Sequence, residues 1–168
     1  MNRLSALAAL VFLAAGCGSS STSPSSPTKP TFTATLLPSS EVPPIVGPEA
    51  SGSGTVTITF DVTKDAAGTI TAASTTFVAN LTGFPAGTTV IAGHIHKAPA
   101  GVAGGVVISA NVSSTTLTNG SGSLVLSNAA PDIAIVQDVL NNPANYYFNL
   151  HSTLNPGGFT RGQLSRVQ

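Results

Sequence analysis

The chain has 168 residues, of which only 7% are charged, and its six basic and six acidic residues cancel. This length suits one domain with a hydrophobic core. Without a cluster of Lys or Arg, the chain lacks the electrostatic means of binding nucleic acid. Thr, Ser, Gly and Val dominate the sequence, and this composition favours strands and turns over helices.

The N-terminal residues have the layout of an export signal. Arg3 supplies a positive charge, a mainly apolar stretch follows over residues 4–15, and Cys17 is the only cysteine of the chain. The apolar stretch is shorter than the roughly 20 residues that a membrane-spanning helix needs, so we expect it to be removed after export. A single cysteine excludes an intramolecular disulfide.

The residues before this cysteine, Leu13-Ala14-Ala15-Gly16-Cys17, resemble the lipobox of bacterial lipoproteins, although the family usually has Leu where Ala14 stands. The resemblance implies a signal peptide over residues 1–16 and a lipid attached to Cys17, which would anchor the protein to a membrane of the cell envelope. Gly18 implies sorting to an outer membrane, on its periplasmic side or at the cell surface. The alternative is an ordinary secretory signal with an incidental cysteine.

Residues 17–30 are rich in Ser and Pro and show no apolar periodicity, which predicts a flexible tether. Residues 31–168 then form the domain. Alternating apolar and polar residues, separated by turn residues, predict about eight strands in it. These strands cover residues 32–37, 55–62, 69–79, 88–96, 105–110, 122–126, 146–152 and 159–164.

One segment, residues 131–142, departs from the strand pattern. Pro131 stands where a first helical residue can stand, Asp132 lies in the first turn, and apolar residues recur at helical spacing until Pro143. The sequence therefore predicts an all-β domain with one short helix. About eight strands in series are typical of a Greek-key β-sandwich or barrel.

Four ordered stretches between Phe32 and Leu164 resemble the CHRD (chordin) domain. Departures are small: Phe148 and Leu150 replace commoner valines, and Phe159-Thr160 precedes an arginine where other residues are usual. In bacteria the resemblance implies an exported domain, and the growth-factor biology of chordin does not transfer with the fold. The matching stretches are Leu37-Pro38-Ser39-Ser40-Glu41-Val42-Pro43-Pro44, Gly93-His94-Ile95-His96-Lys97-Ala98-Pro99-Ala100-Gly101, Asn145-Tyr146-Tyr147-Phe148-Asn149-Leu150-His151-Ser152 and Pro156-Gly157-Gly158-Phe159-Thr160-Arg161-Gly162-Gln163-Leu164.

All three histidines of the chain lie within these stretches. His94 and His96 are two residues apart on a predicted strand, so they face the same side with Cα atoms roughly 6.5 to 7 Å apart. His151 faces the same side of its strand as Tyr147 and Asn149. If the two faces meet, the histidines form a site for copper or zinc, which imidazole nitrogens bind well.

Four further residues are candidates for the surroundings of such a site: Arg161, Asn149, Tyr147 and Glu41. The alternative is that the histidines form structural hydrogen bonds and that Arg161 bonds to backbone carbonyls or to Glu41. The His-x-His strand also resembles the copper-binding strand of Cu/Zn superoxide dismutases, which are Greek-key sandwiches with a late arginine near the metal. Those enzymes need more histidines than this chain has, which argues against a working dismutase.

Two functions are therefore open. One is a non-enzymatic binding or structural module of the cell envelope, which would recognise a protein or glycan through its loops. The other is a metal-binding envelope protein that uses His94, His96 and His151, with superoxide dismutase-like chemistry as an extension. No serine lies in a Gly-x-Ser-x-Gly motif and the acidic residues are scattered, so the sequence assigns no catalytic residue.

Overall fold

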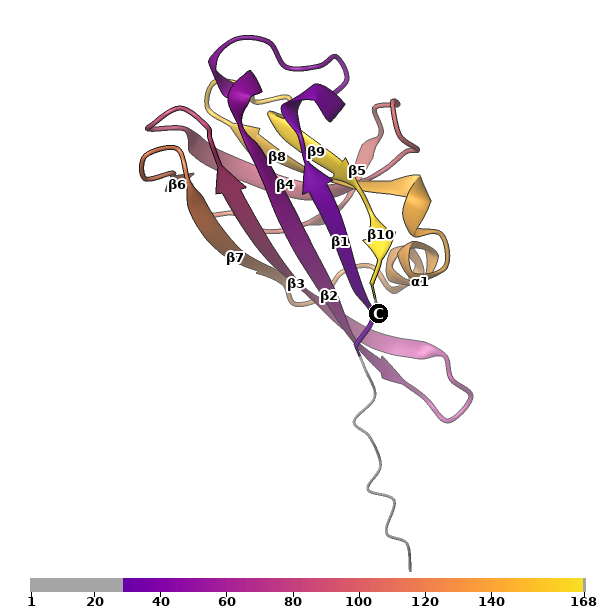
Figure 1. Cartoon of the computed structure of the whole chain (residues 1–168). Helices are drawn as coiled ribbons and strands as arrows, with labels where there is room; N and C mark the ends of the chain where they lie inside the picture. Colours follow the sequence, from indigo (N-terminus) through magenta and orange to yellow (C-terminus); the bar gives the residue numbers. More distant parts are fainter. Residues whose placement is uncertain (1–28, 168) are drawn as a thin grey trace, which may run out of the picture.

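Alternating apolar residues assemble the strands into two antiparallel sheets in a computed structural model that describes residues 29–167 (Figure 1). Sheet A has the strand order β10-β1-β2-β3-β7, and sheet B has the order β5-β4-β8-β9, with β6 paired to β4. The strands are β1 (Thr31–Leu36), β2 (Ser53–Lys64), β3 (Ile70–Thr82), β4 (Thr89–Lys97), β5 (Gly105–Ser109), β6 (Thr115–Thr116), β7 (Gly122–Asn128), β8 (Tyr146–Ser152), β9 (Thr160–Gln163) and β10 (Ser165–Arg166).

The predicted all-β sandwich is confirmed. Each of the eight predicted strands is present, and the structure adds two strands of two residues each, β6 and β10. The sheets do not close into a barrel, because each has its own edge strands. An isolated bridge between Leu37 and Arg161 links the sheets at one side. The predicted signal peptide, Cys17 and nearly all of the tether lie outside the described residues.

The hydrophobic core lies between the two sheets, so one face of sheet B packs on the core and the other face points away from it. Phe77 of β3 and Phe148 of β8 stack across the core with ring centroids 5.4 Å apart, and both side chains are fully buried. Ile95 of β4 and Leu150 of β8 point into the same core. Because side chains alternate along a strand, the histidines and the odd-numbered residues of β8 point to the outer face of sheet B.

The single α-helix of the described residues, α1 (Ile133–Asn141), is the predicted one. It begins after Pro131 and Asp132 because Asp132 is its N-cap, whose carboxylate accepts hydrogen bonds from the backbone N–H groups of Ala134 and Ile135 at 2.8 and 3.1 Å. Asp138 of α1 accepts a hydrogen bond from Lys97 at 2.6 Å and so attaches the helix to sheet B. No helix among residues 29–167 is long and apolar enough to cross a membrane.

The β1–β2 connection carries two short 3-10 helices, at Pro38–Ser40 and Pro48–Ser51, and a third stands at Pro143–Asn145. None of the three was predicted. The connection leaves sheet A at Leu37, whose backbone N–H donates to Arg161 of sheet B at 3.0 Å. It thereby carries Glu41 and Glu49 to the neighbourhood of β8.

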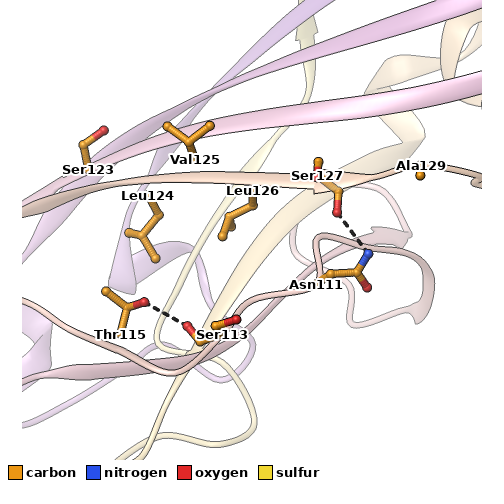
Figure 2. Close-up of a pocket in the computed structure, with 9 residues that line it drawn as sticks. All are labelled: Asn111, Ser113, Thr115, Ser123, Leu124, Val125, Leu126, Ser127 and Ala129. Atoms are coloured by element: carbon orange, nitrogen blue, oxygen red, sulfur yellow. Dashed lines mark hydrogen bonds between the residues drawn. The ribbon is translucent and has the colours of Figure 1, made fainter.

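A groove of about 510 Å³ lies along the edge strand β7, facing residues 111–115 (Figure 2). Leu124 and Leu126 point toward this segment, and Asn111 donates from its side-chain amide to the carbonyl of Ser127 at 2.9 Å. The residues that line the groove are uncharged. It contains none of the histidines, so the candidate site lies elsewhere.

Candidate metal centre

The three histidines meet on the outer face of sheet B. β4 pairs with β8 in an antiparallel register that sets His94 opposite Asn149 and His96 opposite Tyr147. His151 lies further along β8 on the same face. His94 Nδ1 is 3.0 Å from His151 Nε2, and the ligand nitrogens of all three histidines lie within 4.8 Å of one another. The structure thus brings together the three residues that the sequence singled out.

Backbone carbonyls orient two of the three imidazoles. His96 Nδ1 donates to the carbonyl of Gly104 at 2.9 Å, and His151 Nδ1 donates to the carbonyl of Pro156 at 3.0 Å. A carbonyl only accepts hydrogen bonds, so in both rings the proton lies on Nδ1 and the lone pair on Nε2. His96 Nε2 is buried and has no hydrogen-bond partner among the described residues. Such carbonyl contacts are typical of the rings that bind metal ions.

The environment keeps the imidazoles neutral. Burial lowers the pKa of His94 to about 4, and the neighbouring His151 and His96 add to this effect. Burial also lowers the pKa of His96 and of His151. Neutral imidazole is the form that binds metal ions, so binding at neutral pH needs no release of a proton. His94 Nδ1 donates its proton to His151 Nε2 in the structure, and this proton would have to move to His94 Nε2 when an ion binds.

The nitrogen spacing suits one shared ion. Ligand distances of about 2.0 to 2.1 Å around an ion place neighbouring nitrogens roughly 3.3 to 3.6 Å apart. The observed 3.0 Å between His94 and His151 and the 4.8 Å limit of the whole cluster lie on either side of this value. To share one ion, the His94 and His151 nitrogens would have to separate slightly and the more distant nitrogens would have to approach.

Arg161 and Tyr147 lie beside the histidines. Both terminal nitrogens of the Arg161 guanidinium donate to the carbonyl of Val102 at 3.1 Å, which is the backbone contact that the hydrogen-bonding alternative expects. The guanidinium carbon lies 3.5 Å from the centre of the Tyr147 ring. Tyr147 in turn stacks on His96 with centroids 4.8 Å apart and planes within 6°. Both residues thus surround the site without supplying a ligand.

Glu41 and Asn149 form a buried pair next to the cluster. Asn149 Nδ2 donates to Glu41 Oε2 at 3.2 Å, while Glu41 Oε1 and Asn149 Oδ1 are buried acceptors without a partner among the described residues. Burial raises the pKa of Glu41 to about 7, although the Arg161 charge and the Asn149 hydrogen bond oppose this rise. Near neutral pH Glu41 is therefore partly protonated in the folded protein.

Gly158 packs directly on this pair. Its φ of +130° suits glycine, and a Cβ atom at this position would lie 2.6 Å from Asn149 Nδ2 and 3.0 Å from Glu41 Oε1. Gly158 therefore has a steric reason as well as a conformational one.

The sequence did not identify the residues that orient the rings. The carbonyls of Gly104 and Pro156 belong to loops, and the buried Glu49 organises the second loop by accepting hydrogen bonds from Ser152 at 2.7 Å and from Asn155 at 2.6 Å. The sequence signals for these loops are the turn residues 155–158 and the glycine-rich residues 101–105. They predict loops but not the strand face that each loop covers.

The fold and the cluster together define a β-sandwich domain with a loop-covered group of histidines on the outside of one sheet. The family model for the CHRD domain matches residues 32–164, so the chain belongs to the CHRD domain family. This confirms the resemblance found in the four sequence stretches. No curated protein and no solved structure shows a significant match to the chain, and the likeness to superoxide dismutases therefore stays a prediction from the sequence.

Proposed function

We propose that this CHRD domain is a non-enzymatic binding module whose ligand is a copper or zinc ion, bound by His94, His96 and His151. The observation that carries the proposal is the orientation of the rings. Two carbonyls fix protons on Nδ1 of His96 and His151, which leaves a lone pair on each Nε2, and His151 Nε2 lies 3.0 Å from His94 Nδ1. Within the described residues His96 Nε2 is buried without a hydrogen-bond partner, and a bound ion would satisfy it.

The donor set favours copper and zinc over hard cations. All three ligands are imidazole nitrogens, which suit zinc, copper, iron and nickel, whereas magnesium and calcium prefer oxygen. Copper(II) forms the most stable complexes of the divalent first-row metals. Three protein ligands leave a coordination position for water or a small molecule, and the bound ion would supply Lewis acidity there.

The place of this function is the cell envelope. Support for export and for a lipid anchor at Cys17 comes from residues 1–17 of the sequence. An exported protein with a membrane anchor would keep a metal ion site close to the membrane surface. We propose this arrangement as the setting of the domain. Its loops would also be available to bind a protein or glycan partner.

Metal analysis of the purified protein tests the proposal. After loading with copper or zinc and removal of excess ion, the protein is expected to retain about one ion per chain. The control is the variant with His94→Ala, His96→Ala and His151→Ala, which is expected to retain none. The proposal fails if the unaltered protein retains no stoichiometric copper or zinc, or if the triple variant retains as much.

A further inference from the structure

Residues 98–104, here called the 98–104 loop, connect β4 to β5 and reach the outer face of sheet B at His96. The loop supplies the Gly104 carbonyl that accepts the His96 Nδ1 proton at 2.9 Å. Glycine is required at this point, because a Cβ atom on Gly104 would lie 2.2 Å from the carbonyl oxygen of Lys97. The position of this loop therefore decides which way His96 presents its lone pair.

Arg161 attaches the loop to sheet B. It lies on β9, and the two terminal guanidinium nitrogens converge on the Val102 carbonyl in the middle of the loop, each at 3.1 Å. Only 2% of Arg161 is exposed. Two charge-assisted hydrogen bonds from one planar group hold an acceptor in a defined direction, which a lysine does not achieve.

Tyr147 supports the same loop from β8 and also supports the ring of His96. Its hydroxyl accepts a hydrogen bond from the Gly104 N–H at 3.2 Å. Its ring lies between the Arg161 guanidinium, 3.5 Å from the ring centre, and the His96 imidazole, whose centroid is 4.8 Å away. The stack of these three planar groups limits rotation of the His96 ring. The hydrogen bond from Gly104 to the Tyr147 hydroxyl holds the loop where the Gly104 carbonyl accepts the His96 Nδ1 proton.

We propose that Arg161 and Tyr147 are positioning residues for the metal ion: they hold the 98–104 loop so that the Gly104 carbonyl keeps the His96 proton on Nδ1 and its Nε2 free to bind the ion. This inference rests on the proposed metal binding. It assigns Arg161 a role through the loop rather than through its charge, since a positive charge near the site by itself repels a cation.

Two substitutions separate position from charge. Arg161→Lys keeps the charge and loses the paired hydrogen bonds, whereas Arg161→Met loses both. Zn²⁺ affinity of the full chain, measured by competition with a chelator, is expected to fall about 10- to 100-fold in both variants, the usual effect of losing an outer contact of a metal-binding histidine. Affinity within twofold of the unaltered protein in either variant, or tighter binding by Arg161→Met, would overturn the inference. Absence of both Zn²⁺ and Cu²⁺ binding by the unaltered protein would instead overturn the proposed function.

The tautomer of His96 gives a readout that needs no metal. In ¹H–¹⁵N correlation spectra of the metal-free protein, His96 is expected to carry its proton on Nδ1 and to lose this preference in both Arg161 variants. His151 is the internal control, because Pro156 of a different loop accepts its Nδ1 proton. Its tautomer should not change.

Tyr147→Phe keeps the stacked ring and removes only the hydroxyl, so it tests the loop contact even if the Arg161 variants do not fold. We expect a smaller loss of Zn²⁺ affinity and a partial loss of the His96 preference. An unchanged His96 tautomer in every variant that folds would contradict the role of the loop, and so would an equal change at His151.

Discussion

Replacing Glu41 by glutamine is expected to stabilise the protein at pH 8 by about 3 kcal/mol. In the folded state burial raises the pKa of Glu41 from 4.5 to about 7, and this difference corresponds to about 3 kcal/mol between the two protonation states. The folded protein therefore holds this proton more tightly than the unfolded chain does. The contribution of Glu41 to stability is fully present below about pH 4.5, decreases as the pH rises, and is lost above about pH 7.

Glutamine reproduces the protonated form of Glu41. Its amide is neutral at every pH, and its oxygen can accept the hydrogen bond that Asn149 Nδ2 donates to Glu41. Urea unfolding of the metal-free protein and of Glu41→Gln at several pH values checks the result. We expect the difference in free energy of unfolding to be small at pH 4.5 and to grow toward pH 8. The titration of the histidines is common to both proteins and cancels in the difference.

Asp61→Asn is the matched control for this experiment. Asp61 is an exposed carboxylate that pairs with Lys29 at 2.6 Å, and exposed pairs contribute about 0 to 1 kcal/mol. Its substitution should leave the pH dependence of stability nearly unchanged. A Glu41→Gln variant that is less stable than the unaltered protein at pH 8 would show that Glu41 is needed as an anion.

The Phe148→Ala substitution, which removes a ring from the core, is expected to lower the free energy of unfolding by about 3 to 5 kcal/mol, the usual effect of Phe→Ala in a core. Phe148 is fully buried and stacks on Phe77 of the opposite sheet at 5.4 Å. Loss of the ring leaves a cavity between the two sheets, on the core side of β8. Calorimetric or urea unfolding measures the effect.

Val125→Ala is the control for the core substitution. Val125 is 73% exposed on the edge strand β7, so its truncation should change stability by no more than about 0.5 kcal/mol. A Phe148→Ala variant that loses less than about 1 kcal/mol would contradict the packing of sheet B against sheet A.

Most of the fold could be predicted because local patterns decide it. Alternation of threonine with valine, isoleucine and phenylalanine marks β2, and Pro131, Asp132 and Pro143 mark the limits of α1. The order of strands in the sheets could not be predicted, since it depends on pairing between distant segments. The two-residue strands β6 and β10 are too short to show any periodicity.

The candidate site could be predicted in part. A period of two along each strand places His94 with His96, and His151 with Tyr147 and Asn149, on shared faces. Their meeting requires the register of β4 against β8, which no local pattern specifies. The loop carbonyls that orient the rings were beyond prediction for a simpler reason: every residue has a carbonyl, so the sequence contains no signal for those of Gly104 and Pro156.

The central claim is that three imidazoles bind one ion, and X-ray absorption spectroscopy of the zinc-loaded protein tests it most directly. We predict a first shell that contains three nitrogen ligands at about 2.0 to 2.1 Å with the outer-shell scattering of imidazole rings. In the triple histidine variant this signal should be absent. A first shell made only of oxygen, or one with a single imidazole, would contradict the claim.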